Sequence, residues 1–434
     1  MAALKLEFEV KRLKCAGLDV HKNMIMAAII DTDPKTLEAT YKVRKFSAMN
    51  DDILALKDWL LENQCRDVCM ESTGKYWIPV HNILEPHMNN TVLTHPKYVR
   101  AIKGKKTDKR DARWIANLFR FDIVKQSFIP PADIRAMREL SRYRLKLSYM
   151  ATSEKNRYQN SMTISRIRLD SVLSDPFGKS SSAIMGYLLT ENSLDEEKVL
   201  SLIDPRVKAD PEEILRSVRG FKILNEQKFK MNHARSHMDL IERSIQEIND
   251  ELLKIAAPYA GQISCLSEIP GMTEMSALYM ISEIGTDMSV FESDKNFISW
   301  CGVCPASNES NSKKHSTRCG KGGRYLKPLM VQCALAAIKD KKHPYYGIKY
   351  NRIAKRRGKK KAIIAIVRMM LTSIYHMLKD GTAWQPCDYE EIVHPKKPEK
   401  VVLNMQNVIQ FLGEQGADPD TLNLIKAQCA AKVA

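Results

Sequence analysis

Residues 16–30 have the sequence AGLDVHKNMIMAAII. Residues 16–20 are apolar around one acid, Asp19, residues 21–23 are polar, and residues 24–30 are apolar again, which predicts two strands joined by a tight turn. A carboxylate inside an apolar strand is costly to bury unless it is paired or binds a metal ion. Asp19 is therefore the first candidate site residue.

The pattern continues along the first 120 residues. We expect strands at residues 41–46, 67–70 and 91–94, and helices at residues 50–61, capped by Asn50, and 108–119. Strands first, and then alternation of helix and strand, predict a mixed α/β domain.

Three further acids stand out by position. Glu71 ends an apolar strand, and Asp108 and Asp111 lie three apart, so they share one face of a helix. That pair lies in residues 97–113, where it is surrounded by eight Lys or Arg. Acids of this kind could hold two divalent cations for phosphoryl transfer. The alternative is that Asp108 and Asp111 only form salt bridges with neighbouring cations such as Lys105 or Arg110.

The charge of the chain predicts a polyanionic partner. It has 68 Lys and Arg against 51 Asp and Glu, a formal net charge of +17, and cations that neutralise phosphates release condensed counterions. Residues 341–361 hold ten Lys or Arg, no acid and three tyrosines, a composition typical of a nucleic-acid surface. The alternative is a solvated helix face, and the composition does not distinguish DNA from RNA.

The sequence shows no pattern of a signal peptide and no purely apolar run long enough to cross a membrane, so we expect no membrane partner. The ten cysteines form no dense framework in this long chain, which favours reduced thiols in a cytoplasm.

The middle of the chain has apolar residues at helical spacing in residues 134–169 and 211–255. They predict either two long helices that pair as an antiparallel arm or a compact helical subdomain. The Ser-rich residues 170–195 between them are expected to be a connection or an insertion.

The last third begins with Ile269-Pro270-Gly271-Met272 between two helical patterns. This is typical of a helix-hairpin-helix that binds phosphate through backbone amides, or of an ordinary helical hairpin. We therefore expect four parts: residues 1–133, 134–260, 261–385, and a linker with a helical tail at 386–434.

A second segment with candidate catalytic residues lies in residues 301–326. It contains several serines, and Lys313, Lys314, Lys321 and Arg324 could hold a phosphate while a serine attacks it. The alternative is a solvated polar loop. Cys301 and Cys304 have the Cys-x-x-Cys spacing, and zinc ligation with His315 and Cys319 is formally possible, but we interpret these cysteines as packing residues because the spacing matches no common finger.

These motifs carry a family resemblance. Residues 17–22 (GLDVHK), 71–74 (ESTG) and 106–112 (KTDKRDA) are similar to the three signature blocks of a RuvC-like, RNase H-fold nuclease domain. This domain resembles that of the DEDD-type transposases of bacterial insertion sequences, the bridge-RNA-guided serine recombinases. The resemblance implies that Asp19, Glu71, Asp108 and Asp111 are catalytic and bind two Mg²⁺ ions per site.

The second segment resembles the same family. Its C-terminal domain has a Gly-x-Cys-Pro-x-x-Asn-Glu-Ser block and then a basic stretch that ends in Tyr-Leu, and residues 302–310 and 321–326 are similar to both. The family's nucleophilic serine falls on Ser310. Because Asn311-Ser312 replaces the small pair that usually follows, Ser312 is the reserve candidate.

The resemblance implies a transposase or recombinase that cleaves and exchanges DNA strands through a 5′-phosphoserine. It also implies double-stranded DNA and a structured guide RNA as partners, and we expect a dimer that becomes a tetramer, in the bacterial cytoplasm at the nucleoid. Two alternatives remain: a metal-dependent junction resolvase and a non-catalytic regulator. The cations expected to bind nucleic acid are Lys103, Lys105, Lys106, Arg110, Lys313, Lys314, Lys321, Arg324, Lys355, Arg356, Arg357, Lys359 and Lys360.

Overall fold

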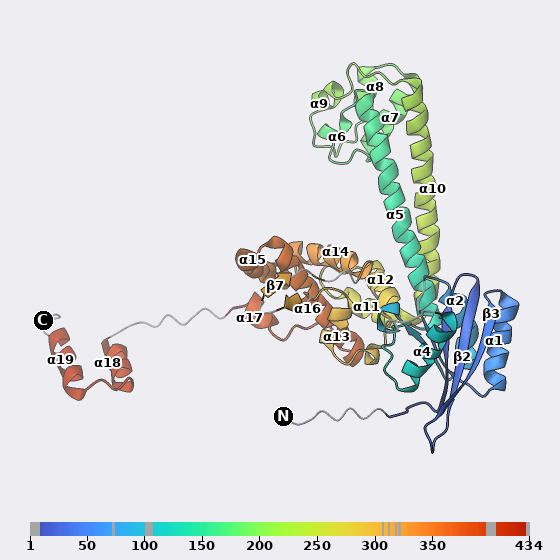
Figure 1. Cartoon of the computed structure of the whole chain (residues 1–434). Helices are drawn as coiled ribbons and strands as arrows, with labels where there is room; N and C mark the ends of the chain where they lie inside the picture. Colours follow the sequence, from blue (N-terminus) through green and yellow to red (C-terminus); the bar gives the residue numbers. More distant parts are fainter. Residues whose placement is uncertain are drawn as a thin grey trace. The chain divides into compact units, whose positions relative to one another are not determined.

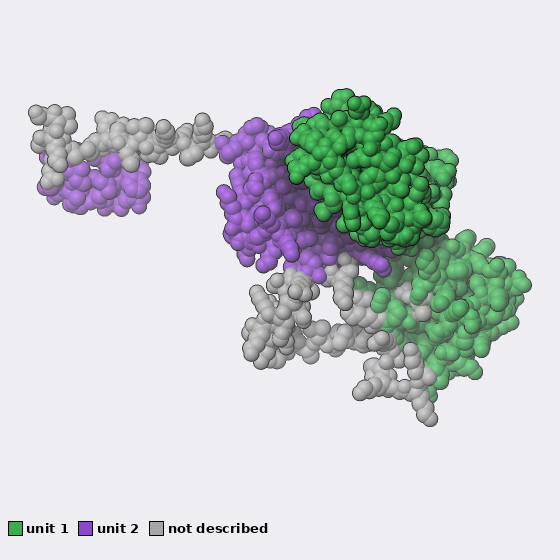
Figure 2. Space-filling view, turned by 90° about the horizontal axis from the view of Figure 1, so that it is seen from above, with its two compact units in different colours: residues 1–260, 278–290 green, residues 261–277, 291–434 purple. Residues whose placement is uncertain are grey.

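The structure is a computed structural model that describes residues 9–71, 74–99, 107–305, 308–310, 313–316, 319, 323–395 and 405–430. The chain forms two compact units, which Figure 2 shows in different colours. The first unit contains residues 1–260 and 278–290, and the second contains residues 261–277 and 291–434.

The first unit begins with a five-stranded mixed sheet in the order β3-β2-β1-β4-β5. β1, β2 and β3 are antiparallel neighbours, whereas β1, β4 and β5 run parallel. The predicted mixed α/β domain is confirmed. Its elements are β1 (Lys14–Val20), β2 (Met24–Thr32), β3 (Ala39–Ser47), α1 (Asn50–Glu62), β4 (Asp67–Glu71), α2 (Trp77–Leu84), η1 (Glu85–His87), β5 (Asn90–Thr94), α3 (Pro96–Val99) and α4 (Asp108–Arg120).

The predicted cap of the first helix is wrong. Met49 occupies the cap position with an extended backbone, and no side chain accepts a hydrogen bond there. Asn50 is already inside the helix. Asp52 instead accepts a hydrogen bond from the backbone N–H of Ser47, so the chain entering α1 is held by an acid of its first turn.

The central strand β1 is buried on both faces of the sheet. Its alternate residues Ala16, Leu18 and Val20 belong to a core that includes residues of α1 and α2. Cys15 belongs to a second core with Ile115 and other residues of α4. Because side chains alternate across a strand, Gly17 and Asp19 lie on the α4 face, and Figure 1 shows α1 and α4 on either side of the sheet.

Gly17 allows α4 to approach this strand closely. A Cβ atom at Gly17 would lie 2.4 Å from both the Ala112 carbonyl oxygen and the Ala116 amide nitrogen, where only backbone atoms of α4 could give way. Any larger residue would therefore push the helix away from the sheet.

The predicted pair of long helices is confirmed, although not with the expected bounds. α5 (Ala132–Ile164) and α10 (Asn225–Ala256) run side by side in Figure 1. The second long helix does not begin at Pro211, which opens only the short α9 (Pro211–Arg216). The segment between the long helices also contains α6 (Leu169–Val172), α7 (Lys179–Glu191) and α8 (Glu196–Ser201), which share a hydrophobic core with residues of α5 and α10.

After α10 the chain passes through η2 (Ala257–Tyr259) and α11 (Ala260–Ser267) to α12 (Glu274–Ile284) and η3 (Met288–Val290). Part of α12 is held against α5. Arg142 forms an ion pair of 2.7 Å with the buried Glu283, and Arg138 donates hydrogen bonds to the carbonyl oxygens of Ser282 and Glu283.

The second unit is mainly helical. It contains α13 (Asp294–Trp300), β6 (Asn308–Ser310), β7 (Lys313–Ser316), α14 (Leu326–Lys339), α15 (Tyr345–Arg357), α16 (Lys359–Asp380), α17 (Tyr389–Val393), α18 (Met405–Glu414) and α19 (Pro419–Ala430). The helical hairpin around Gly271 is confirmed. Gly271 has a φ of +84°, and an added Cβ would lie 2.4 Å from the Cys333 carbonyl oxygen of α14, so packing alone requires glycine there.

α16 is long and apolar enough to cross a membrane by length and composition alone. Eight of its residues are buried, among them Ile366, Met370 and Ile374, and its first residues are lysines. These features fit the core helix of the second unit.

Replacing Gly17 by valine should lower the unfolding free energy of the first unit by about 1–3 kcal/mol or more, because the new side chain overlaps the α4 backbone. Urea denaturation of the full-length protein measures the change. The control is Gly186→Ala in α7, where the nearest atom to the new Cβ lies 3.7 Å away and alanine favours the helix by about 1 kcal/mol. An unchanged unfolding free energy for Gly17→Val would contradict the close approach.

Candidate functional site

Asp19 lies in the last part of β1 and is 5 % exposed. Burial raises the pKa of its carboxyl group above the usual value, and the charges of Asp111 and Asp108 raise it further. His21 acts in the opposite direction, since its Nε2 atom lies 3.1 Å from the Asp19 Oδ2 atom. The site thus concentrates negative charge around a carboxylate that is largely shielded from water.

Asp108 and Asp111 come from the first turn of α4. The N-terminal end of a helix favours negative charge, so these acids also suit their position in the helix. Ala112 follows Asp111 directly, and its carbonyl is one of the groups that face Gly17 on β1. The contact that joins α4 to the sheet therefore also brings both acids to the end of β1, two residues beyond Gly17.

Glu71 reaches the same edge of the sheet through strand pairing. Leu18 of β1 is in parallel register with Met70 of β4. The next residues along the two strands are Asp19 and Glu71. Neighbouring parallel strands end at the same edge, so the four predicted acids converge on one region of the first unit.

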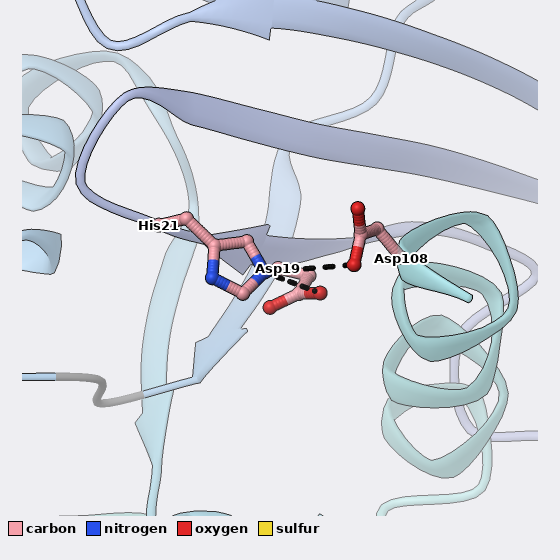
Figure 3. A group of neighbouring side chains, drawn as sticks. All are labelled: Asp19, His21 and Asp108. Carbon is pink, nitrogen blue, oxygen red and sulfur yellow. Dashed lines mark hydrogen bonds and ion pairs between the residues drawn. The ribbon is translucent and has the colours of Figure 1, made fainter. Parts of the chain in front are cut away.

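His21 is a site residue that sequence reasoning missed. It lies in the turn between β1 and β2, and Figure 3 shows its ring directed toward Asp19 and Asp108. Its Nε2 atom lies 3.8 Å from the Asp108 Oδ1 atom. The signal was present in the sequence, since the histidine is two residues after the strand acid. Because it occupies a polar turn, it was interpreted only as part of that turn.

The donor set fits a divalent cation. Ligand atoms of Asp19, His21 and Asp108 all lie within 4.8 Å of one another. These three residues are the group of potential metal ligands that lie this close together among the described residues. Carboxylate oxygens suit Mg²⁺ or Mn²⁺, and an imidazole nitrogen suits transition-metal ions.

The serine segment forms a short β-hairpin in the second unit. Ser310 ends β6, and its backbone is paired in antiparallel register with Lys313 of β7. Ser312, the reserve candidate, lies outside the described residues. The backbone register therefore places one of the predicted phosphate-binding lysines directly across from the predicted nucleophile.

The two motif blocks around this hairpin meet through their backbones. Gly323 has a φ of +68°, and an added Cβ would lie 2.1 Å from the Cys301 carbonyl oxygen. Pro305 and Cys319 form an isolated β-bridge, and the Cys319 thiol donates a hydrogen bond of 3.4 Å to the Val303 carbonyl. These contacts explain why the motif needs a glycine at Gly323, and they bring together the segments that flank the hairpin.

Cys301 is buried, and burial raises the pKa of its thiol. A redox-active cysteine needs an accessible thiolate, so this environment disfavours thioredoxin-type chemistry. It supports the interpretation of Cys301 as a packing residue.

The predicted cations are distributed over both units. Arg110 and Arg324 are exposed, and so are Lys355, Arg356, Arg357, Lys359 and Lys360 of α15 and α16. The side chains of Lys313 and Lys314 are not described. Lys103, Lys105, Lys106 and Lys321 lie outside the described residues.

Comparison with known protein families decides the assignment. Residues 16–165 match a family model for transposases of the DEDD type, DEDD_Tnp_IS110, and residues 263–347 match the model described as Transposase IS116/IS110/IS902 family. The chain belongs to the IS110 family of DEDD transposases. No curated protein matches it.

Family membership carries several general properties. The DEDD transposase domain implies an RNase H-like fold, with which the mixed sheet of the first unit is compatible. DEDD transposases process DNA and typically depend on divalent metal ions. The four acids lie inside the first matched region, and Ser310 lies inside the second.

We expect Asp19→Asn to raise the melting temperature of the ion-free protein at neutral pH by a few degrees. The raised pKa of Asp19 means that its protonated form stabilises the fold below the unfolded-state pKa, and that this contribution is lost as the pH rises through the folded-state pKa. Above the folded-state pKa the buried charge is therefore destabilising, and asparagine removes it.

The same variant should lose the stabilisation that Mg²⁺ or Mn²⁺ gives the wild type, since an ion that binds only the folded state raises its stability. Differential scanning fluorimetry in chelator and in excess ion measures both effects. Asp31→Asn on β2, an exposed acid paired with Lys14, is the control and should keep the ion response. A lower melting temperature for Asp19→Asn in chelator would contradict the prediction.

Proposed function

We propose that this chain cleaves and exchanges DNA strands with Ser310 as the nucleophile and with divalent ions held by Asp19, Glu71, Asp108 and Asp111. The observation that carries the proposal is the presence of both halves of the chemistry in one chain. An acid cluster with the donor set for a divalent ion lies in the first matched region, and a serine hairpin lies in the second.

The proposed reaction has two steps that balance. The Ser310 Oγ atom forms a bond to phosphorus while the bond from phosphorus to the 3′ oxygen breaks. The serine proton ends on that oxygen, which leaves as a 3′-hydroxyl, and the other DNA end is held as a 5′-phosphoserine. The oxygen of a 3′-hydroxyl from another strand then bonds to the same phosphorus while the bond from phosphorus to the Ser310 Oγ atom breaks, and the proton of that hydroxyl ends on the serine oxygen.

The residues of the chain have separate tasks in these steps. Divalent ions bound by the acids would supply charge stabilisation for the developing oxyanions, and the proposal includes two Mg²⁺ ions per site. The register of the hairpin supports a role for Lys313 in holding the phosphate that Ser310 attacks. Because each step exchanges one phosphodiester for another, no external energy source is required.

The proposed partners are double-stranded DNA from the element ends and the target, and a structured guide RNA that pairs with both. Base pairing would then provide most of the sequence specificity. Strand exchange needs at least two active sites, so we propose a dimer that assembles into a tetramer. The site of action would be the bacterial cytoplasm, at the nucleoid.

The cations of α15 and the start of α16 support the nucleic-acid part of the proposal. Lys355, Arg356 and Arg357 form the last turn of α15, and Lys359 and Lys360 open α16. All five are exposed, and no acid interrupts residues 341–361. A concentrated positive surface of this kind attracts phosphates through counterion release.

Ser310→Ala should abolish the covalent protein–DNA adduct and lower strand exchange by on the order of 10³-fold or more. The protein is expressed beside its native flanking DNA and lysed in denaturant with Mg²⁺, and the nucleotide-linked peptide is identified by mass spectrometry. Asp19→Asn should also remove the adduct, whereas Ser316→Ala, on the partner strand β7, should keep it.

The other outcomes separate the alternatives. Cleavage without an adduct, unaffected by Ser310→Ala, would favour a metal-dependent junction resolvase. An adduct on Ser312 would move the nucleophile by two residues. Binding without cleavage, unaffected by alanine at all four acids, would indicate a regulator.

Replacing Lys355, Arg356, Arg357, Lys359 and Lys360 by alanine should weaken DNA binding and flatten its salt dependence. The slope of log K against log salt should fall by about 0.9 for each residue that contacts a phosphate. Fluorescence anisotropy over a range of salt concentrations measures this slope.

The matched control removes five cations that are already paired with carboxylates in the structure. Their charge is largely compensated, so the slope should change much less than in the first variant. An equal change in both variants would mean that only net charge matters. The control residues are Lys11, Lys14, Arg206, Arg219 and Lys254.

A further inference from the structure

His21 is held in place by the turn that it occupies. Its backbone N–H donates a hydrogen bond of 2.9 Å to the Met24 carbonyl oxygen, which closes the turn between β1 and β2. Its side chain is 44 % exposed, so its ring can be reached from solvent. In Figure 3 the ring lies beside two acids from different elements, Asp19 from the sheet and Asp108 from α4.

Of the two distances measured from this ring, 3.1 Å is close to that between neighbouring ligands of one metal ion, and 3.8 Å lies between the values for neighbouring and opposite ligands. Neighbouring ligands of an octahedral ion with bonds of about 2.1 Å lie about 3.0 Å apart, and opposite ligands lie about 4.2 Å apart. The His21 Nε2 atom lies 3.1 Å from the Asp19 Oδ2 atom and 3.8 Å from the Asp108 Oδ1 atom. The three groups therefore need little rearrangement to bind the same cation.

A purely orienting role for His21 explains less of this geometry. A histidine that only fixed Asp19 would need one hydrogen bond, which the 3.1 Å contact supplies. That role does not require the second contact, in which the Asp108 carboxylate lies 3.8 Å from the same nitrogen atom. Asp111 also acts electrostatically on Asp19, so the local excess of negative charge favours a cation at this position.

We propose that His21 is a direct nitrogen ligand of one divalent ion, together with Asp19 and Asp108. This inference rests on the proposed function, because it assumes the ion that the four acids are proposed to hold. A nitrogen ligand makes the set less specific for Mg²⁺, which prefers oxygen, and favours Mn²⁺ and later transition-metal ions. His21 then sets which metal the transposase selects.

The test is pulsed electron paramagnetic resonance on the full-length protein with MnCl₂, without DNA. Coordination by His21 produces a hyperfine coupling between Mn²⁺ and ¹⁴N, which changes to the ¹⁵N pattern when the protein is labelled with ¹⁵N-histidine. His21→Gln keeps a side chain that can hydrogen-bond to Asp19 but offers no imidazole nitrogen. It should lose the coupling and raise the Kd for Mn²⁺ by about 10-fold, with a change of less than about 3-fold for Mg²⁺.

The matched control is His343→Gln. His343 also bonds to an aspartate, since its Nδ1 atom lies 3.1 Å from the Asp340 Oδ2 atom, but this pair belongs to the second unit and includes none of the four acids. This variant should keep the nitrogen coupling and both ion affinities.

The outcomes separate this inference from the function on which it rests. Mn²⁺ that binds the wild type and is lost in Asp19→Asn, but shows no ¹⁴N coupling, overturns the role of His21 and leaves the proposed metal site standing. Equal loss of affinity for Mn²⁺ and Mg²⁺ in His21→Gln, with the coupling retained, also overturns it. A wild type that binds neither ion contradicts the metal site itself and the inference with it.

Discussion

The site of the first unit depends on the contact between α4 and the central strand at Gly17. The backbone of α4 occupies the space where any other residue would carry its Cβ, with two atoms only 2.4 Å from that position. Asp19 follows Gly17 by two residues, and Asp111 directly precedes Ala112. Asp19 and the acids of the first turn of α4 come together because the helix and the strand cannot separate without leaving a cavity beside the buried core of the sheet.

That arrangement leaves the free protein with an unfavourable concentration of charge. Asp19 is buried, and its neighbours Asp108 and Asp111 carry the same charge, so the pKa of Asp19 rises. His21 partly offsets this effect from the adjoining turn. A divalent cation, as the proposed function requires, would compensate the charge more fully. The charge of the Asp19 carboxylate therefore lowers the stability of the free protein, whereas the proposed function needs that charge to bind an ion.

In the second unit, too, glycines allow backbone segments to approach each other closely. Gly323 lies against the Cys301 carbonyl and Gly271 lies against α14, each in a conformation with positive φ and each with no room for a side chain. These glycines belong to sequence motifs of the family, yet in the structure they allow backbone segments to pack against each other. The motif around Ser310 is thus defined as much by packing as by chemistry.

The sequence alone determined the alternation of strands and helices, the buried acid of β1 and the three motif blocks, because these depend on local periodicity and on residues close together in the chain. It did not determine that His21 joins Asp19 and Asp108, since that contact needs α4 to be placed on the sheet by Gly17. It also missed the start of α10 at Asn225, because Pro211 is an equally good first residue for a helix and only the core that α6–α9 form with the long helices decides between them. Contacts between distant residues are set by packing, which only the tertiary structure decides.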